Sequence, residues 1–418
     1  MYGVEFSFET LEEIKDNVFE LNLKYEEAQK LARKTARKLS SESHRMFKRL
    51  IEHTQHCEIN DEAERLSADI DEEAHRHLRN IRNMSADLIE MLTPEPVSGK
   101  GEGRKAQILW ELSQVHKQTA TLTKYDELIY WLDTSDNSTV SLCAIPKNLD
   151  KRLYEDLWSK GVPMVLTSGT LSAAGDFSHI KRTIGIEHVT NRRLTETSKP
   201  SPFNHRDNTL LYLSENVPFP DQQSKAYIDA LTDEIEQLIY ASNGHAAVLF
   251  TSYNTMGLVY AKLHQRGIPF PLFRLDKGGV REIERFKQSG NGVLFASGAM
   301  WEGIDIPGDI LSMLIIVKLP FAVPDSISEY EQTLYPSFHE YLNTVIMPEM
   351  LIKLKQGFGR LIRTERDSGV VAILDSRVSN DGVYRECVLN ALPECCVTYD
   401  IDDVEHFFED KKEPSYFE

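Results

Sequence analysis

The fold is decided by the stretch Gln356-Gly-Phe-Gly-Arg360-Leu-Ile-Arg363-Thr-Glu-Arg-Asp367. If it is helical, Gln356, Arg360 and Arg363 lie at i, i+4 and i+7, so an amide and two guanidinium groups project from one face. Arginine's planar, permanently charged group suits the spread negative charge of a phosphoryl group in transfer. The stretch therefore predicts a phosphate-binding face. The alternative is a solvated amphipathic helix, which the two glycines disfavour because glycine is costly inside a helix.

A mononucleotide-type α/β domain is predicted around this stretch. Val370-Val-Ala-Ile-Leu374 follows it as a buried strand, and before it strand-like and helix-like segments alternate. The other predicted strands are 210–213, 246–251, 271–275, 292–296 and 310–317, and the predicted helices between them are 222–241, 255–265 and 279–288. Such alternation indicates βαβ units, and hence a mainly parallel sheet with helices on both faces.

Composition and charge limit the class of protein. The chain has 418 residues, of which 41% are hydrophobic and 27% charged, as in an ordinary globular protein of two or three domains. Its formal charge of −18 argues against non-specific polyanion binding by the whole molecule, but not against binding through local basic patches. The five cysteines lack the spacing of a metal site, which indicates thiols in a reducing compartment. Because we find no signal peptide and no long apolar run, we expect a cytoplasmic protein without a membrane partner.

An all-helical module is predicted in the N-terminal part. Residues 24–49 are rich in Lys and Arg, including Arg33, Arg37 and Lys48, whereas residues 58–73 are mainly acidic. Apolar residues recur at helical spacing through both segments, which predicts an antiparallel hairpin with a basic arm against an acidic arm. The charges are equally typical of a solvated surface. A third helix is expected at about 106–125.

Two sequences in this module resemble nucleotide-binding motifs, and we reject both. Asp71-Glu-Glu-Ala-His75 is similar to a DEAH box, but the segment before it is amphipathic helix and not a hydrophobic strand. Gly99-Lys-Gly-Glu-Gly-Arg-Lys105 lacks the spacing G-x-x-x-x-G-K-[ST], and no strand precedes it. We therefore recognise no Walker A loop in the sequence.

Hydroxyl groups follow several predicted strands. A hairpin of strands is expected at 128–132 and 140–145, then a helix at 149–160, then a strand at 163–167 that leads into Thr167, Ser168 and Thr170. These hydroxyls could bond a phosphate, a carboxylate or their own backbone. In a parallel sheet, ligands meet the carboxyl ends of strands, where the sequence places a further set of polar residues and glycines: Thr251, Ser252, Ser297, Glu302, Gly303 and Asp305.

Taken together, these segments resemble the bacterial DinG helicases and their XPD-like relatives in helicase superfamily 2. The resemblance covers about Leu128 to the C-terminus and rests on four motifs in the family's order. These are motif III at 167–172, motif IV at 248–253, motif V at 301–308 and motif VI at 356–363, accompanied by Ser201-Pro-Phe-Asn204.

The resemblance implies a motor with two RecA-like lobes, which binds ATP between them and moves along single-stranded DNA, usually 5′ to 3′. By carry-over, Arg360 and Arg363 face the γ-phosphate, Gln356 senses it, and Gly359 lies in the same motif. Glu302, Gly303 and Asp305 would couple nucleotide to strand, while Thr167, Ser168 and Thr170 would transmit closure of the cleft. The implied DNA contacts are Thr251, Ser252, Ser297 and the basic arm with Arg33, Arg37 and Lys48.

The sequence departs from the family at its beginning. The phosphate loop, the DEAH carboxylates that hold Mg²⁺ and the four-cysteine iron–sulfur segment are not found, so we expect the C-terminal part of a longer helicase that needs the missing first lobe as a partner. No iron–sulfur cluster is expected in this chain. The expected domains are a remnant or linker (1–20), an arch-like helical module (21–126), a first-lobe remnant with apolar edges that ends in motif III (127–178) and the second RecA-like lobe (179–418).

Two other classes of protein remain open at this point. A non-catalytic protein could grip single-stranded nucleic acid through the basic arm and the hydroxyls at the strand ends, using a motor lobe as a scaffold. A pure interaction module could instead dock a protein partner through the charged hairpin.

Overall fold

The computed structural model describes residues 2–54, 65–68, 70–97, 101–124, 127–134, 140–173, 175–221, 224–275, 280–297, 306 and 308–417. The chain forms two compact units, residues 1–160 with 323–338, and residues 161–322 with 339–418. No helix in these described ranges is long and apolar enough to cross a membrane.

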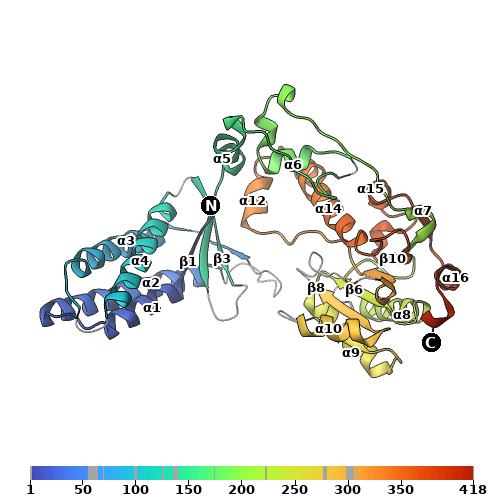
Figure 1. Cartoon of the computed structure of the whole chain (residues 1–418), viewed down its shortest axis with the longest axis horizontal. Coiled ribbons are helices and arrows are strands. Elements are labelled where there is room, and N and C mark those ends of the chain that lie inside the picture. Colours follow the sequence, from blue (N-terminus) through green and yellow to red (C-terminus); the bar gives the residue numbers. More distant parts are fainter. Residues whose placement is uncertain are drawn as a thin grey trace. The chain divides into compact units, whose positions relative to one another are not determined.

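The first unit joins a helical bundle to a small antiparallel sheet (Figure 1). The long helices are α1 (Phe8–Glu20), α2 (Glu26–Thr54), α3 (Glu72–Leu92) and α4 (Glu102–Leu122), and the sheet has the order β1-β4-β3-β2. Its strands are β1 (Val4–Ser7), β2 (Arg65–Ser67), β3 (Leu128–Asp133) and β4 (Ser141–Pro146). Short helices α5 (Leu149–Asp156) and α12 (Ser326–Gln332) complete the unit.

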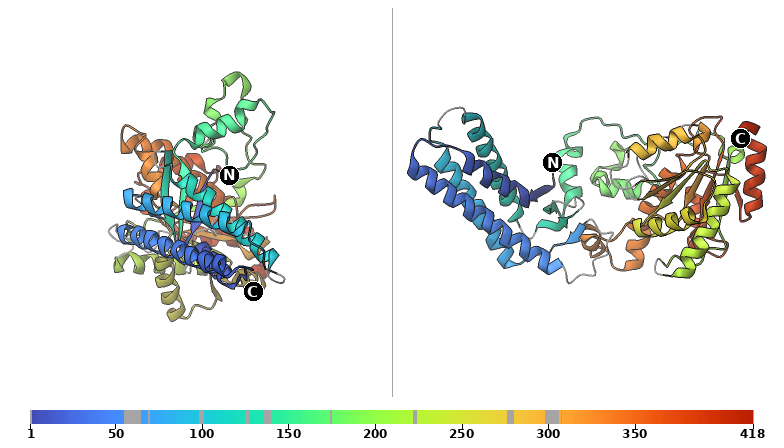
Figure 2. Two further views of the ribbon diagram at one scale, coloured as in Figure 1. Left: turned by 90° about the vertical axis from the view of Figure 1, so that its left-hand side faces the viewer. Right: turned by 90° about the horizontal axis from the view of Figure 1, so that it is seen from below.

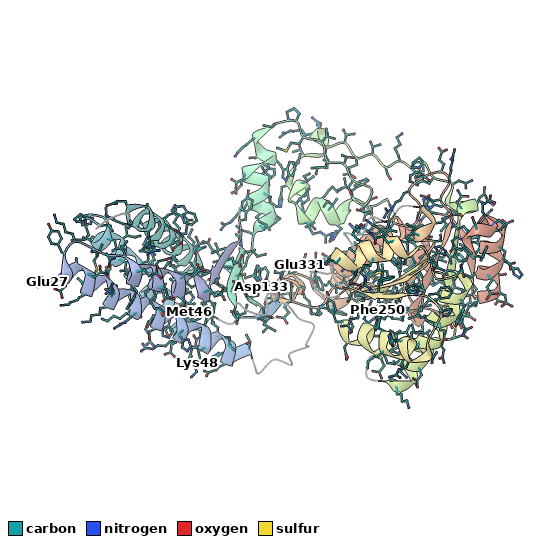
Figure 3. The ribbon with its side chains drawn as sticks, turned by 60° about the horizontal axis from the view of Figure 1, so that its bottom comes forward. Glu27, Met46, Lys48, Asp133, Phe250 and Glu331 are labelled. Carbon is teal, nitrogen blue, oxygen red and sulfur yellow. The ribbon has the colours of Figure 1, made fainter. Side chains whose placement is uncertain are left out.

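The bundle forms because each helix has an apolar stripe. Met46 of α2 lies in the core, whereas Lys48, two positions on, is exposed on the outer face (Figure 3). Arg49 of α2 donates to Asp71, the N-cap of α3, and also pairs with Glu73 at 2.7 Å. Helices α2 and α3 thus pack together as predicted, but the acidic arm expected at 58–73 is not helical where it is described: residues 65–67 form strand β2, and α3 begins only at Glu72. The segment before Asp71–His75 is therefore not the amphipathic helix that the sequence predicted. The residues between them, 55–64, lie outside the described ranges.

Three predictions for the first unit are wrong. Residues 4–20 are not a linker, because Ser7 caps α1 and its Leu11, Ile14 and Val18 are buried at helical spacing. The strands at 128–133 and 141–146 do not have exposed edges, since each is paired with a strand on either side. The structure also groups residues 127–160 with the helices, and brings residues 323–338 into the same unit.

The second unit is a seven-stranded parallel sheet between two layers of helices (Figure 2). Its order is β11-β5-β10-β9-β6-β8-β7. The strands are β5 (Thr209–Leu213), β6 (Ala246–Phe250), β7 (Leu272–Arg274), β8 (Val293–Ser297), β9 (Met313–Ile316), β10 (Gly369–Ile373) and β11 (Cys396–Thr398). This is the predicted α/β fold, and both faces of the sheet are covered as expected.

Alternate residues of each strand are buried against different helices. One face packs on α10 (Val280–Ser289), α14 (Met347–Phe358) and α15 (Arg385–Ala391). The other packs on α8 (Lys225–Ala241), α9 (Tyr253–Arg266) and the docked final helix α16 (Ile401–Lys411). Shorter helices are α6 (Ser178–Thr183), α7 (His205–Asn208) and α13 (Phe338–Tyr341), and a π-helical turn (Leu342–Ile346) leads from α13 into α14.

The strand predicted at 163–167 is not formed. These residues belong to no helix or strand, and Val165 is 89% exposed. A strand needs a neighbour for its backbone groups, and the described residues of this unit place none beside this segment.

Candidate nucleotide site

A cavity of about 870 Å³ lies at the end of α14. It is lined by the last turn of this helix, by the turn that follows and by the segment before α7. Gln356, Arg360 and Arg363 all line it, as does Gly359, so the structure brings the predicted phosphate-binding residues together. Lys199 and Lys355 add two further cationic side chains.

The predicted continuous helix through Arg363 is wrong. Helix α14 ends at Phe358, and the chain then turns back at Gly359 and Arg360. The carboxylate of Asp367 accepts hydrogen bonds from the backbone N–H groups of Arg363 and Thr364, at 2.9 and 2.8 Å. The helix therefore stops because this acidic side chain satisfies the backbone of the turn, while the guanidinium groups still reach the same cavity.

The Arg363 side chain is held by its own turn. Its Nε donates to the carbonyl oxygen of Arg360 at 3.0 Å. Burial lowers the pKa of Arg363, with Asp367 acting in the opposite direction, but an arginine remains charged at any physiological pH. The site thus holds a partly desolvated cation, whose attraction for an anion is stronger than that of a cation in open water.

The floor of the cavity is aromatic. The imidazole of His205 lies 5.7 Å from the Phe358 ring and 6.3 Å from the Phe203 ring, measured between centroids. Its Nε2 is 3.0 Å from the hydroxyl of Ser201, and burial lowers the pKa of His205, which keeps the ring neutral. Phe203 and His205 thus join the predicted segment 201–204 to the end of α14.

Motif III lies beside motif VI within this unit. The amide Nε2 of Gln356 donates to the hydroxyl of Thr170 at 3.3 Å, and Thr170 in turn is 3.3 Å from the Ser168 hydroxyl. Thr170 lines the cavity, whereas Thr167 and Ser168 are exposed. A movement of Gln356 at the end of α14 would therefore act directly on Thr170 through this hydrogen bond.

The cavity lies at the amino ends of neighbouring strands. Helix α7 directly precedes β5, and Leu361 lies against Gly369, the first residue of β10. The predicted strand-end hydroxyls are at the opposite, carboxyl edge, where Thr251 and Ser252 follow β6 and Ser297 ends β8. The two predicted sets of residues therefore form two separate surfaces of one domain.

The strand-end hydroxyls differ in what they do. Ser252 is buried and caps α9, accepting from the backbone N–H of Thr255 at 3.2 Å. Ser297 is also buried, and its hydroxyl has no hydrogen-bond partner in the described part of the chain. Thr251 is partly exposed. The predicted coupling residues Glu302, Gly303 and Asp305 lie outside the described residues.

Two arginines of the basic arm, Arg33 and Arg37, already make contacts within the first unit. Arg33 donates to the carbonyl oxygen of Phe19 at 2.7 Å, and the guanidinium of Arg37 lies 4.7 Å from the Phe19 ring centroid. Lys48 lies 3.8 Å from Glu52 on the exposed face of α2. Of the three predicted contacts, Lys48 is thus on the surface, and the two arginines also pack against α1.

Sequence reasoning missed several residues of the cavity. Lys199, His205 and Lys355 line it but stand outside the four motifs. The nearby segment 201–204 was the only signal that pointed to His205. The rejected sequence Asp71–His75 forms the start of α3, so its first carboxylate is a helix cap paired with Arg49.

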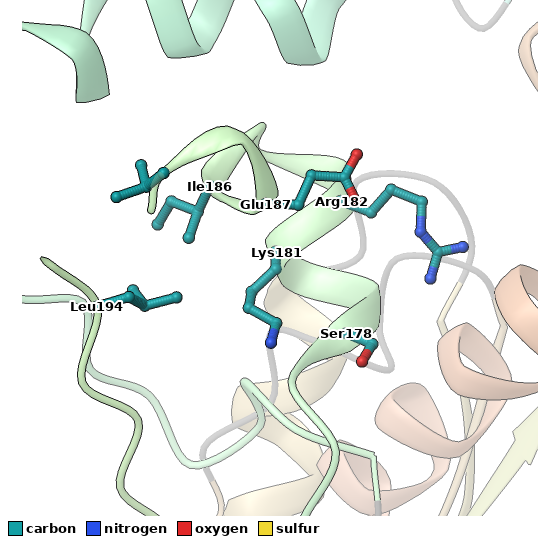
Figure 4. Close-up of a pocket in the computed structure, with 7 residues that line it drawn as sticks. Ser178, Lys181, Arg182, Ile186, Glu187 and Leu194 are labelled. Atoms are coloured by element: carbon teal, nitrogen blue, oxygen red, sulfur yellow. The ribbon is translucent and has the colours of Figure 1, made fainter. Parts of the chain in front are cut away.

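A second, smaller cavity lies near α6. It measures about 270 Å³ and has Ser178, Lys181 and Arg182 on one side and Ile186 and Leu194 on another (Figure 4). Lys181 is paired with Glu196 at 2.8 Å, which neutralises its charge. Since none of the predicted site residues lines this cavity, we assign the candidate site to the larger one.

A family model and a solved structure indicate the class of protein to which the chain is similar. Residues 235–395 match the helicase C-terminal domain family. The whole chain is similar to a solved structure of apo XPD, with a TM-score of 0.54 at 16% identity, over 95% of this chain and 73% of that one. Residues 235–395 of the second unit are therefore similar to a helicase C-terminal domain, and the fold of the chain is similar to that of XPD.

Sequence relatives narrow the class. The chain is 31% identical over 284 residues to the ATP-dependent DNA helicase YoaA of Haemophilus influenzae, covering 68% of this chain and 43% of YoaA. It is 29% identical over 270 residues to the ATP-dependent helicase DinG of Mycobacterium tuberculosis, covering 63% of this chain and 40% of DinG. The chain is thus similar to part of the YoaA and DinG helicases, and spans less than half the length of either.

Proposed function

We propose that this chain supplies the second half of an ATP-driven motor that moves along single-stranded DNA, 5′ to 3′. The observation that carries the proposal is the convergence of Gln356, Arg360 and Arg363 on one cavity at the end of α14. Two guanidinium groups and an amide around one space suit a γ-phosphate in transfer, where charge is spread over several oxygens. Arg360 and Arg363 would stabilise that charge, and Gln356 would report it to Thr170.

The donor set fits the phosphates of ATP but not a metal ion. Among the described residues that line the cavity, the charged groups are Lys199, Lys355, Arg360 and Arg363, and none is a carboxylate. Mg²⁺ takes oxygen ligands, so we place its ligands on the missing first lobe. This chain alone would then turn over almost no ATP, because both the metal and the phosphate loop are supplied elsewhere.

The missing first lobe is the proposed partner for residues 162–167. Val162, Met164, Val165 and Leu166 are exposed by 59, 45, 89 and 48%. A run of exposed aliphatic side chains outside any helix or strand favours a segment that adds as a strand to a neighbouring sheet. By function we propose an arch at residues 21–126, a remnant of the first lobe ending in motif III at 127–178 and the second lobe at 179–418, whereas the compact units divide the chain after residue 160.

The other predicted residues complete the proposal. Thr251, Ser252, Ser297, Arg33, Arg37 and Lys48 would contact DNA phosphates, and Glu302, Gly303 and Asp305 would couple them to the nucleotide. Ser252 would do so while it caps α9, as a serine hydroxyl can accept and donate at once. We propose a cytoplasmic protein with no membrane partner and no iron–sulfur cluster in this chain.

The test is the turnover of the complete enzyme when one arginine is removed. We expect Arg363→Ala to lower kcat for ATP by at least about a hundredfold, because a charge that stabilises the transition state is lost. Arg366→Ala is the matched control, since Arg366 is exposed on the same loop and does not line the cavity. Normal turnover by Arg363→Ala, or an equal loss in both variants, would refute the assignment.

A further inference from the structure

An aromatic cluster surrounds Arg377 at the carboxyl edge of the parallel sheet. Phe219 follows β5, Phe321 follows β9, and Arg377 and Tyr384 follow β10. The guanidinium carbon of Arg377 lies 5.9, 5.0 and 5.8 Å from the ring centroids of Phe219, Phe321 and Tyr384. Three loops that are far apart in sequence therefore place aromatic rings around one cation. None of the predicted site residues belongs to this cluster.

The cation is fixed in position by a buried carboxylate. Arg377 donates from Nε and Nη2 to the two oxygens of Asp375, at 2.9 and 2.6 Å. Asp375 is 1% exposed, and it also accepts the backbone N–H of Leu319 at 2.9 Å. This two-point pair orients the guanidinium plane and neutralises its charge. The cluster is therefore a rigid surface of flat groups with little net attraction for a phosphate.

One ring of the cluster faces the solvent. Phe219 is 65% exposed, while Phe321 and Tyr384 are partly buried, with ring centroids 5.5 Å apart and ring planes tilted by 55°. Val383, next to Tyr384, is 79% exposed. A phenyl ring that is backed by a guanidinium and open on the other side is suited to stack with a flat, uncharged group. Nucleic-acid bases are such groups, and single-stranded nucleic acids bind in this way to aromatic and arginine side chains.

The cluster continues the row of strand-end hydroxyls. Strand β9 lies between β10 and β6, so the edge runs from Arg377 past Phe321 to Thr251 and then to Ser297. Strand β5, which leads to Phe219, is three strands from β6 and four from β8 in this sheet, and adjacent strands are about 4.8 Å apart. The base-stacking group and the phosphate-binding groups thus lie along the same edge of the sheet.

We propose that Phe219, mounted on the Arg377 cluster, is a stacking platform for one base of a single-stranded nucleic acid. The proposal rests on the proposed function, which places phosphates at Thr251 and Ser297 but assigns no residue to the bases. In this proposal the Phe219 ring contacts the base, and Arg377 holds that ring in position. Because every base has a flat face, the contact would be independent of sequence, as a translocating motor requires.

The experiment measures the affinity of the full chain for two fluorescent oligonucleotides of equal length, one of thymidines and one in which every base is absent. Phe219→Ala should weaken binding of the thymidine strand about tenfold and leave binding of the abasic strand unchanged. Phe417→Ala is the matched control, because Phe417 is 41% exposed but lies at the C-terminal end, away from the cluster. It should alter neither affinity.

A second variant gives a direct signal of stacking. Phe219→Trp should retain affinity for the thymidine strand and show tryptophan quenching, beyond that of the unaltered chain, that the abasic strand does not cause. Unchanged affinity of Phe219→Ala for the thymidine strand would overturn the stacking proposal, as would an equal loss for both strands. If the unaltered chain binds neither strand, both the DNA part of the proposed function and this inference fail. If it binds both strands equally and Phe219→Ala has no effect, only this inference fails.

Discussion

At the scale of single residues, the position of the turn that carries Arg363 depends on Gly369. Gly369 opens β10, where Leu361 of the arginine turn packs against it. A Cβ atom at this position would lie 2.4 Å from the carbonyl oxygen of Ser312 and 3.0 Å from the Leu361 side chain. The absence of a side chain therefore allows β10, β9 and the turn that carries Arg363 to come together.

We predict that Gly369→Ala destabilises the second unit by about 1 to 3 kcal/mol, because backbone must move to admit the methyl group. Gly257→Ala in α9 is the control, since nothing lies within 4 Å of its added Cβ. Alanine there should be neutral or stabilise by up to about 1 kcal/mol. Hydrogen exchange of the β9 and β10 amides would measure both effects, and equal protection in the two variants would contradict this account.

The sequence predicted the motif residues of the candidate site. It was less informative about the other residues that line the cavity or hold the motif residues in place. Gln356, Arg360 and Arg363 were predicted to act together, and they line one cavity. Lys199 could not be predicted, because only the folded chain brings residue 199 beside the end of α14, whereas Lys355 directly precedes Gln356 and was overlooked. Ser252 was expected only as a phosphate contact, and the structure adds its role as a helix cap.

At the scale of elements, the contact between α2 and α3 is held by an ion pair that responds to pH. The Arg49 guanidinium holds the pKa of Asp71 at about 2, below the ordinary value of about 3.9. A carboxyl group with a lowered pKa stabilises the folded state above its unfolded pKa, and that contribution is lost as the pH falls toward 2. The Arg49–Asp71 ion pair should thus contribute more to the stability of the first unit at pH 7 than at pH 3.

We predict that Asp71→Asn lowers the stability of the first unit by about 1 kcal/mol at pH 7, allowing for partial exposure of the pair, and by about half of that at pH 3. Asparagine keeps the N-cap that Asp71 provides to Ala74. Asp71→Ala should cost about 1 kcal/mol more at both pH values, because the cap is lost as well. Urea unfolding followed by circular dichroism would measure these differences, and an effect of Asp71→Asn that is independent of pH would contradict the ion-pair explanation.

The bounds of helices and strands were predicted well where the spacing of apolar residues determines them. They were predicted poorly where contacts with distant parts of the chain determine them. The strands and helices from 209 to 316 lie within a few residues of their predicted bounds. Helix α14 ends earlier than predicted because Asp367 captures the following turn, which periodicity does not reveal. The expected strand at 163–167 is unpaired for the same reason: its sequence suits a strand, but pairing depends on a neighbour.

At the scale of the whole molecule, the sequence predicted the fold class but not how the chain is divided. The parallel sheet with two helical layers is present as expected. The hairpin predicted at 128–132 and 140–145 is present as β3 and β4, but the two outer strands of the small antiparallel sheet were not foreseen. They are only a few residues long, and they join residues 4–7 to 141–144 and residues 65–67 to 131–133. Nor could periodicity place residues 323–338, which leave the second unit and join the first.

The central claim is that the cavity at the end of α14 is half of an ATP site. The most direct test is ATP hydrolysis by this chain, with and without single-stranded DNA, alone and after addition of the separately expressed first lobe of a close relative. We predict no turnover by the chain alone and DNA-stimulated turnover in the mixture, which Arg363→Ala abolishes and Arg366→Ala preserves. Hydrolysis by the chain alone at the rate of the mixture, or full activity of the mixture with Arg363→Ala, would contradict the claim.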